Sequence, residues 1–499
     1  MDKKFLKIEY ILILIYSLIT KFFVSINSIR FNEVFTESDQ SIFFSIGKAM
    51  LNGKVLYKDV FDHKTPYIYF FNALAAIFEK NHLGLFIIEV CLLSIILIFL
   101  YKTARIFVSG ARAFFATLFL SIILCIPEIT FGYSRTEMYA IAFIMPSIYL
   151  FTKYFLLDSD DKNYADKMFI IAMLACLTLM TNIRAVIIFI PFALLTCVKL
   201  INEKRYINIL ILFLVGILGV VITLIPYTVY AIFTDSIFDA IYAIITTNIN
   251  YAKSNSAVDK NLLYVAGLFI SQNKMFFTFL FLSFVSWFFI KVDLELKISI
   301  IASFVITFIY VVFSYKTNVY YLVILMPYLL SLYFLLSRFI DKILKKATLP
   351  VLILSSVICL LINMYINRSI DIRYTNCVNR AARINKAIEN NISNRENIKV
   401  LSYGFNPEVY IYTKDVLNYK YFIIPNVSYK ADPTAYEAQY NYIMSADPDV
   451  VVYANSATGN NMPKMMFDRL RYTLSTSYKL VDEFKTNNFT GTFYIFIKL

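Results

Sequence analysis

The chain of 499 residues is far more hydrophobic than a soluble protein. Hydrophobic residues make up 59% of it, charged residues 16%, and its mean hydropathy is +0.65. So few charges cannot cover the surface of soluble domains, and intrinsic disorder requires the opposite balance. The formal net charge of +13 is spread over short segments between apolar runs, which excludes a basic nucleic-acid-binding domain. The composition predicts a polytopic α-helical membrane protein.

Apolar runs predict about eleven membrane-spanning helices, because about twenty apolar residues cross the hydrocarbon core of a bilayer. We place the N-terminus, with Lys3, Lys4 and Lys7, in the cytoplasm. The segments between spans then alternate between the two sides of the membrane. This places eighteen Lys and Arg residues in cytoplasmic segments and six in short outer loops, as the positive-inside rule requires. The C-terminus is therefore predicted to lie outside the cell. The expected spans are roughly 8–29, 83–101, 113–127, 138–156, 168–181, 185–199, 207–233, 275–290, 298–314, 319–337 and 349–366.

Three segments are predicted to face outward. The first outer loop covers about 30–82, and a polar, mobile outer loop covers about 234–261. Both belong to a membrane domain over 1–366, and a small extracytoplasmic α/β domain follows over 367–499. Short apolar clusters in this last region predict strands of a mixed sheet, alternating with helical patterns. The clusters lie at 400–403, 421–424, 450–453 and 493–496, and the helical patterns near 374–391, 433–445 and 462–477.

The first outer loop contains two predicted helices. Apolar residues recur at helical spacing from Ser38, which can cap the helix start, and Gly53 can end it. Such an amphipathic helix is expected to lie in the membrane interface. A polar loop from Tyr57 to Pro66 and a second apolar helix at about 67–79 follow.

Ionisable residues gather at the predicted outer face of the membrane. Placing a charge there costs free energy, so each of these residues is a candidate for a functional role. Carboxylates there can act as bases, and cations can hold a phosphate group. Five of these residues lie in the first outer loop, and three lie at the ends of later spans. They are Asp39, Asp59, Asp62, His63 and Lys64, and then Arg135, Glu137 and Arg184.

The stretch from Glu37-Ser-Asp39 to Lys64-Thr-Pro66 resembles the first outer loop of GT-C membrane glycosyltransferases. It is most similar to the bacterial family-39-type branch, which is related to protein O-mannosyltransferases and the lipid A aminoarabinose transferase. The stretch from Ser134 to Ala140 resembles their second outer loop. One departure is Asn318-Val-Tyr320-Tyr321, where many relatives have a His-Tyr-Tyr-like triplet.

The resemblance implies an enzyme that transfers a sugar from a polyprenyl-phosphate-sugar to an extracytoplasmic glycan, lipid or protein. It maps the family's catalytic acid onto Asp39 and its phosphate-binding lysine onto Lys64. In a single-displacement, inverting transfer, Asp39 accepts the acceptor's proton, and Lys64 with Arg135 or Arg184 stabilises the departing phosphate. Glu137 is expected to orient the acceptor or Asp39. No cofactor is required, and a divalent metal ion is neither implied nor excluded.

Other interpretations of these residues stay open from the sequence alone. Asp39 can serve as a helix N-terminal acid, and Lys64 as a snorkelling anchor. Asp59 and Asp62 are typical of turns, and His63 of an exposed loop. At the level of the whole chain, a lipid or polysaccharide transporter or flippase and a non-catalytic envelope assembly protein are the alternatives.

Overall fold

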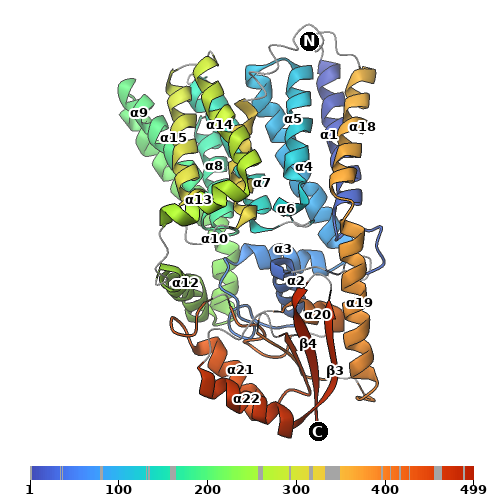
Figure 1. Ribbon diagram of the computed structural model, residues 1–499. Coiled ribbons are helices and arrows are strands. Elements are labelled where there is room, and N and C mark those ends of the chain that lie inside the picture. Colours follow the sequence, from blue (N-terminus) through green and yellow to red (C-terminus); the bar gives the residue numbers. More distant parts are fainter. Residues whose placement is uncertain are drawn as a thin grey trace. The chain divides into compact units, whose positions relative to one another are not determined.

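The computed structural model is mainly helical and forms two compact units (Figure 1). The first comprises Met1–Ser25, Phe86–Tyr227 and Lys260–Arg368, and the second Ile26–Leu85, Thr228–Asp259 and Ser369–Leu499. The residues described are 3–33, 35, 38–78, 83–130, 132, 135–157, 164–256, 262–290, 294–313, 318–331, 349–394, 397–404, 406–414, 417–425, 427–454, 463–486 and 489–499.

Helices in the first unit occur at every predicted span, over the residues that the structure describes. Helices α13 and α14 bend by 96° at their junction. The segment η5 is a 3-10 helix with Pro327 inside it, a geometry that is uncommon over so many residues. The helices are α1 (Lys3–Val24), α4 (Leu83–Phe107), α5 (Gly110–Leu124), α6 (Pro127–Thr130), α7 (Thr136–Leu150), η2 (Phe151–Leu157), α8 (Tyr164–Leu179), η3 (Ala185–Ile188), α9 (Phe189–Asn202), α10 (Tyr206–Phe233), α13 (Leu262–Gln272), α14 (Lys274–Phe289), α15 (Leu294–Val312), η5 (Val319–Leu329) and α18 (Leu349–Ile366).

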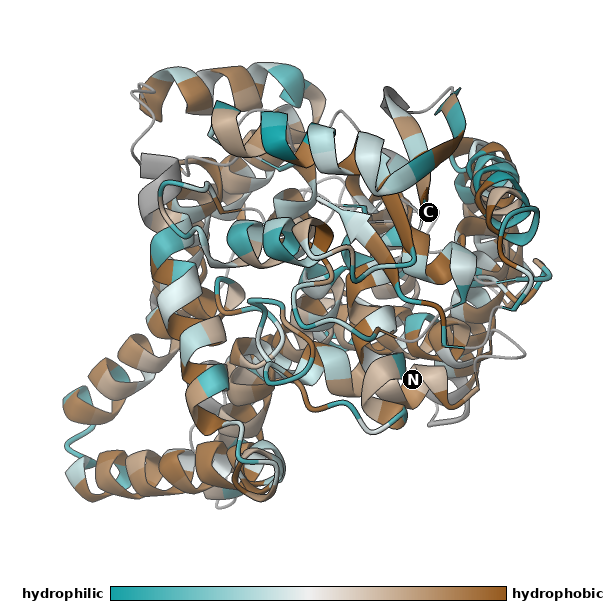
Figure 2. Cartoon of the chain, turned by 90° about the horizontal axis from the view of Figure 1, so that it is seen from below, coloured by the Kyte–Doolittle hydropathy of each residue, from teal (hydrophilic) through white to brown (hydrophobic). Residues whose placement is uncertain are grey.

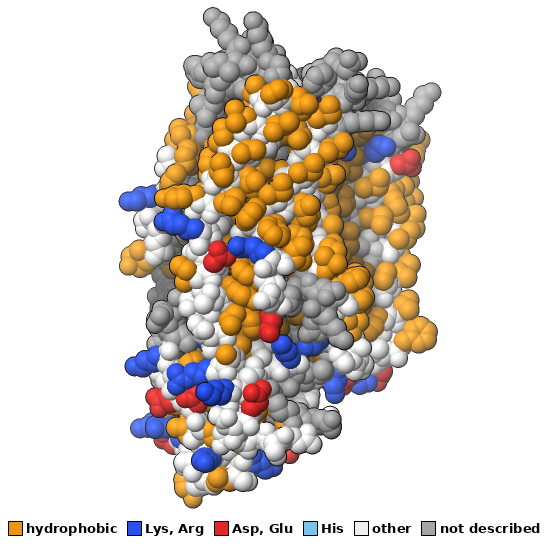
Figure 3. Space-filling model, turned by 90° about the vertical axis from the view of Figure 1, so that its right-hand side faces the viewer, with side chains coloured by type: hydrophobic (Ala, Val, Ile, Leu, Met, Phe, Trp, Pro, Cys, Tyr) orange, Lys and Arg blue, Asp and Glu red, His pale blue; other side chains and the backbone are white. Residues whose placement is uncertain are grey.

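The outer surfaces of these helices are apolar, which matches a lipid environment. Large hydrophobic side chains such as Phe213, Leu354 and Leu361 are more than half exposed. Hydrophobic residues follow the helices in Figure 2 and form a broad surface on the face shown in Figure 3. Four described helices are long and apolar enough to cross a membrane, or five if the bent pair α13–α14 is one span. The chain is a multi-pass membrane protein.

Several polar side chains inside the first unit are paired with one another. Lys21 of α1 lies 3.2 Å from Glu89 of α4, and both side chains are at most 6% exposed. Nearby in the sequence of α1, Tyr16 bonds Ser121 at 2.7 Å and accepts a bond from the Asn363 amide at 2.8 Å. Because an unpaired charge or amide is costly in an apolar interior, these pairs hold α1, α4, α5 and α18 in one arrangement.

The second unit begins with the two helices predicted in the first outer loop. Helix α2 (Ser38–Leu51) ends before Gly53, whose φ of +82° is accessible to glycine at little cost, and α3 spans Tyr67–Ala76. A Cβ atom at Gly47 would lie 2.5 Å from the backbone nitrogen of Ala73. The two helices therefore pack backbone against backbone at this glycine.

The predicted mobile outer loop is helical over most of its described part. It contains α11 (Ile237–Ile241), the π-helical η4 (Tyr242–Thr246) and α12 (Thr247–Ser256). The hydroxyl oxygen of Tyr230, just before it, accepts a 2.9 Å bond from the Leu56 amide, and Lys58 lies 3.4 Å from Asp235. This segment and the first outer loop are thus bound to each other within the second unit.

The C-terminal part of the second unit contains a four-stranded mixed sheet, as predicted. The strand order is β1-β2-β4-β3, with β1 and β2 parallel and the other pairs antiparallel. Helices α21 and α22 cover one face, where Leu470 and Leu474 pack in a hydrophobic core. Helix α19 lies on the other, where Arg383 bonds Asp482 at 2.6 Å. The elements are α19 (Ile370–Glu389), β1 (Val400–Tyr403), α20 (Glu408–Thr413), α21 (Thr434–Met444), β2 (Val450–Ala454), α22 (Lys464–Thr476), β3 (Tyr478–Thr486) and β4 (Phe489–Lys498).

The prediction of a strand at 421–424 was wrong. The carbonyl of Tyr421 accepts a bond from the Gln439 amide, and that of Phe422 accepts one from the Tyr410 hydroxyl. Side chains therefore satisfy backbone groups that a strand would pair with a neighbour. The sheet instead includes β3, whose polar exposed residues gave no strand pattern.

Candidate functional site

The eight predicted site residues divide between the two units. Asp39, Asp59, Asp62, His63 and Lys64 belong to the second unit, and Arg135, Glu137 and Arg184 to the first. Two further residues of the predicted motifs, Glu37 and Ser134, lie outside the described residues.

In the second unit, Asp39 lies in the first turn of α2 and is partly buried. The next residue, Gln40, is buried and donates its amide to Asn72 of α3 at 2.6 Å. Asn72 in turn donates to the Ile68 carbonyl at 2.7 Å. The position of Asp39 is therefore fixed by the packing of α2 on α3.

Asp62 is the buried centre of the loop that carries Lys64. Its side chain is 2% exposed, lies 3.0 Å from His63 Nδ1 and accepts a 2.7 Å bond from the Tyr69 hydroxyl. Burial alone raises the pKa of Asp62, but the charge and hydrogen bond of His63, the charge of Lys64 and the Tyr69 hydroxyl hold it below its usual value. Asp62 is thus an anion around which the loop is built.

The backbone of Lys64 is held from both sides. Its carbonyl accepts a 2.7 Å bond from the Tyr57 hydroxyl, and its amide donates to the Tyr69 oxygen at 3.2 Å. Its side chain is partly buried. These bonds fix the backbone position from which the Lys64 side chain extends, and a phosphate-binding lysine requires such a fixed support.

Asp59 closes a turn, and His63 is more buried than the sequence indicates. Asp59 Oδ2 accepts a 2.8 Å bond from the Val55 amide. The His63 side chain is 8% exposed, and its carbonyl accepts a 2.7 Å bond from the Asn248 amide. The interpretation of His63 as an exposed loop residue was therefore wrong, because α12 packs over it.

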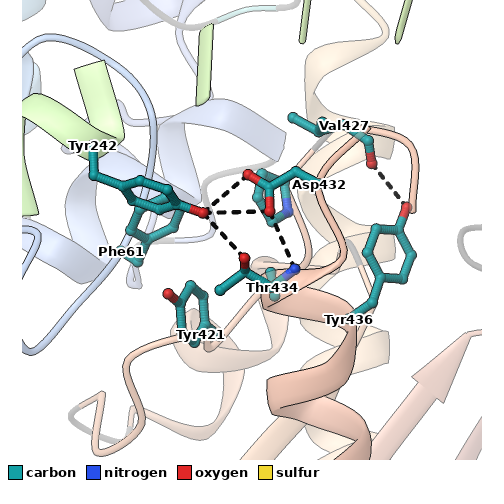
Figure 4. A pocket seen from close by; sticks show the side chains of 9 residues that line it. Phe61, Tyr242, Tyr421, Val427, Asp432, Thr434 and Tyr436 are labelled. Carbon is teal, nitrogen blue, oxygen red and sulfur yellow. Dashed lines mark hydrogen bonds between the residues drawn. The ribbon is translucent and has the colours of Figure 1, made fainter. Parts of the chain in front are cut away.

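Phe61 attaches the same loop to an aromatic cluster with Tyr242 and Tyr421 (Figure 4). The Phe61 ring lies 5.9 Å from that of Tyr242 and 5.2 Å from that of Tyr421. The Tyr242 hydroxyl reaches Asp432 at 3.1 Å and Thr434 at the same distance. The loop, η4 and the segment before α21 are thus joined within the second unit.

In the first unit, Glu137 is a buried carboxylate bound to the turn that follows α8. It is 3% exposed, and it accepts a 3.0 Å bond from the Asn182 amide and a 3.2 Å bond from the Thr136 hydroxyl. Asn182 Oδ1 accepts the backbone amide of Arg184 at 3.1 Å. Asn182 therefore connects Glu137 to Arg184, the residue just before η3.

Both arginines lie over tyrosine rings at the start of η5. The Arg135 guanidinium lies 4.1 Å from the centre of the Tyr320 ring, and that of Arg184 lies 4.9 Å from Tyr321. The two rings meet edge to face at 4.8 Å. Cation–π contact attracts and orients a guanidinium without neutralising its charge.

These contacts join Arg135, Tyr320, Tyr321, Arg184 and Glu137 into one cluster, which we call the arginine–tyrosine cluster. Asn318 completes it by donating its amide to Tyr320 at 2.8 Å and to Tyr321 at 3.3 Å. Two oriented guanidinium groups can bind an anion with several oxygens, such as a phosphate. In the sequence, Asn318, Tyr320 and Tyr321 stand out only as a departure from the family pattern, and their position before Pro327 is the signal that marks them.

The described residues include no group of three His, Cys, Asp or Glu side chains that could hold a metal ion. Asp62 and His63 lie together, but Asp62 contacts His63 and Tyr69, so structural contacts explain their proximity.

The fold has clear relatives among solved structures. One is ArnT from Cupriavidus metallidurans, the lipid A aminoarabinose transferase, in its structure bound to undecaprenyl phosphate. Its TM-score to this chain is 0.63 at 9% sequence identity, and the match covers 100% of this chain and 99% of that one. Its apo form gives a TM-score of 0.61 at 9% identity, covering 99% and 98%. The oligosaccharyltransferase AglB from Archaeoglobus fulgidus, in complex with an inhibitory peptide and a dolichol-phosphate, gives 0.50 at 11% identity, covering 91% of this chain and 70% of that one. The chain has the GT-C fold.

At the level of sequence, no curated protein is significantly similar to the chain. One family model, described as "Putative competence-induced protein Ccs4 N-terminal domain", matches residues 2–348. That match covers well over half of the chain, so the chain belongs to the Ccs4 N-terminal-domain family.

Proposed function

We propose that the protein is a membrane glycosyltransferase that transfers a sugar from a polyprenyl-phosphate-sugar to an extracytoplasmic acceptor. The observation that carries the proposal is the arginine–tyrosine cluster, in which two guanidinium groups lie over two tyrosine rings that contact each other. The GT-C fold supports it, because ArnT of the same fold was solved with undecaprenyl phosphate bound. A polyprenyl phosphate also fits a protein with extensive apolar helix surfaces.

In the proposed reaction, the acceptor hydroxyl attacks the anomeric carbon while Asp39 accepts its proton. The bond from that carbon to the phosphate oxygen breaks, and the charge of the released polyprenyl phosphate is stabilised by Lys64 with Arg135 or Arg184. A phosphate leaves as an anion of low basicity, so no general acid is needed. Glu137 orients the acceptor or Asp39. Asp59, Asp62 and His63 contribute by shaping the loop that carries Lys64.

The proposed location follows from the charge pattern of the loops: a multi-pass protein with about eleven spans, a cytoplasmic N-terminus and an outward C-terminal region. The acceptor is an envelope glycan, glycolipid or protein.

Two variants test the proposal in the purified, reconstituted full chain. Asp39→Asn should abolish transfer while expression and folding persist, and near-normal transfer would refute its role as base. Lys64→Ala should raise the donor concentration needed for half-maximal rate more than the acceptor concentration. An equal effect on both would argue against contact with the donor phosphate.

The transporter alternative predicts charges deep inside spans and a matched pair of broken helices. Among the described residues, Lys21 and Glu89 form a buried pair with each other, and α13–α14 is one bent pair. Neither observation indicates a transport pathway across the membrane, so the transferase remains the function that the site supports best.

A further inference from the structure

A second site lies in the C-terminal part of the second unit, between α22 and the sheet. It is a groove with a cavity volume of about 600 Å³, within the range of about 300–1,000 Å³ typical of ligand sites. We call it the α22 groove. Its lining residues are Tyr453, Phe467, Leu470, Arg471, Leu474, Ser475, Tyr478, Leu480, Tyr494 and Phe496.

The floor of the α22 groove is rigid and aromatic. Tyr453 of β2 and Tyr494 of β4 are directly opposite each other in the sheet, and their rings stack at 5.9 Å with a 21° angle between planes. Tyr478 is buried, and its hydroxyl donates to the Pro448 carbonyl at 3.0 Å. Leu470 and Leu474 beside it belong to the hydrophobic core. The groove therefore keeps its shape without a ligand.

The rim of the groove is polar and cationic. Arg471 and Ser475 are both exposed and stand one helical turn apart on α22. From Lys464 to Lys498 the chain carries six Lys or Arg residues and three acidic ones. One of those acids, Asp482, is bound to Arg383 on the other face of the sheet. Among the residues that line the groove, Arg471 is the charged one, so a charged group on a ligand at the rim would meet a cation.

Together these features fit one class of ligand. Sugar rings present flat C–H faces that pack on aromatic rings, and their hydroxyl groups bond to polar side chains at a rim. A carboxylate or phosphate on the sugar would meet the fixed charge of Arg471. A purely apolar ligand would leave Arg471 and Ser475 unused. We infer that the α22 groove binds an anionic glycan chain, which, if the proposed transferase function holds, is the acceptor.

Direct binding tests this inference on the full chain in nanodiscs of neutral lipid. The probe is a hexamer of galacturonate, with maltohexaose as the neutral control, and the measurement is isothermal titration calorimetry. The galacturonate oligomer should bind at least about fivefold more tightly than maltohexaose. Tyr494→Ala should abolish this binding, and Arg471→Gln should weaken it about fivefold. Equal binding of the two oligomers would overturn the inference.

Arg469→Gln is the matched control, because Arg469 is exposed on the same helix but does not line the groove. It should change the affinity less than twofold. An equal loss with both arginine variants would show diffuse charge attraction and overturn the site. Displacement of the probe by short-chain phosphatidylcholine, unaffected by Arg471→Gln, would identify a lipid groove instead and would also overturn it.

Binding and transfer can fail separately. Donor turnover without oligomer binding would overturn the α22 groove alone. Oligomer binding without donor turnover would support the groove and overturn the transferase.

Discussion

Each arginine of the arginine–tyrosine cluster rests on the face of one tyrosine, 4.1 Å away for Arg135 and 4.9 Å for Arg184. A ring can orient a guanidinium and leave its charge available, whereas a carboxylate would orient it and cancel the charge. The buried carboxylate of the cluster, Glu137, accepts hydrogen bonds from Asn182 and Thr136. At the residue scale, tyrosine is thus the platform suited to an anion-binding arginine.

Tyr320→Leu should therefore lower donor turnover by about 3- to 30-fold, the equivalent of one cation–π contact. Tyr320→Phe keeps the ring and loses only the hydroxyl that Asn318 contacts, so it should retain most of the activity. Steady-state rates at several donor concentrations measure both. Equal loss in the two variants would show that the hydroxyl matters and the ring does not.

Asp62 gives a pH-dependent prediction. Its pKa is held below the ordinary 3.8, so its stabilisation is complete above that value and is lost as the pH falls through the lower native pKa. Asp62→Asn should destabilise the protein by about 1–3 kcal/mol at neutral pH. The difference in apparent melting temperature between the two proteins should shrink below about pH 4. A constant difference across that range would contradict the ionised state of Asp62.

At the element scale, some packing could be predicted and some could not. Ser38 and Gly53 mark the ends of α2 in the sequence, because capping and a positive φ are local properties. The bond from Asn248 to the His63 carbonyl joins residues 185 positions apart, and no local pattern encodes it. For the same reason the segment 234–261 was predicted to be a mobile loop, although its described residues 237–256 form helices with partners in the second unit.

Gly47 is where α2 meets α3, so Gly47→Ala should destabilise the protein by about 1–3 kcal/mol through overpacking. Its Cβ would lie 2.5 Å from a backbone atom, which cannot move aside like a side chain. Gly267→Ala in α13 is the matched control, since no atom lies within 4 Å of its added Cβ. It should be neutral or stabilising by up to about 1 kcal/mol. Equal melting temperatures for the two variants would contradict the close approach of α2 to α3.

At the scale of the whole molecule, hydropathy identified the membrane class and the resemblance identified the GT-C fold. The grouping of residues into two compact units was harder to predict from the sequence. The first outer loop and the segment 228–259 share a compact unit with 369–499, although they are far apart in the chain. Contacts such as Tyr242 with Asp432 produce this grouping, and they depend on side chains that the sequence alone leaves unplaced.

The predicted topology can be tested in cells with single cysteines in a cysteine-free chain. A cysteine in place of the exposed Lys479 should react with a membrane-impermeant maleimide in intact cells. One in place of the exposed Asn202, at the end of α9, should react only after lysis. The reverse pattern would invert the orientation on which the extracytoplasmic acceptor depends.

The central claim is that the protein removes sugar from a polyprenyl-phosphate-sugar. The most direct measurement reconstitutes the full chain with the lipid extract of its host and the acceptor-containing envelope fraction, and follows the lipids by mass spectrometry. We predict that one polyprenyl-phosphate-sugar species is consumed, that polyprenyl phosphate appears, and that Asp39→Asn prevents both. The mass difference would also give the mass class of the sugar. No consumption by protein shown to be folded would contradict the transferase and favour the transporter or assembly alternatives.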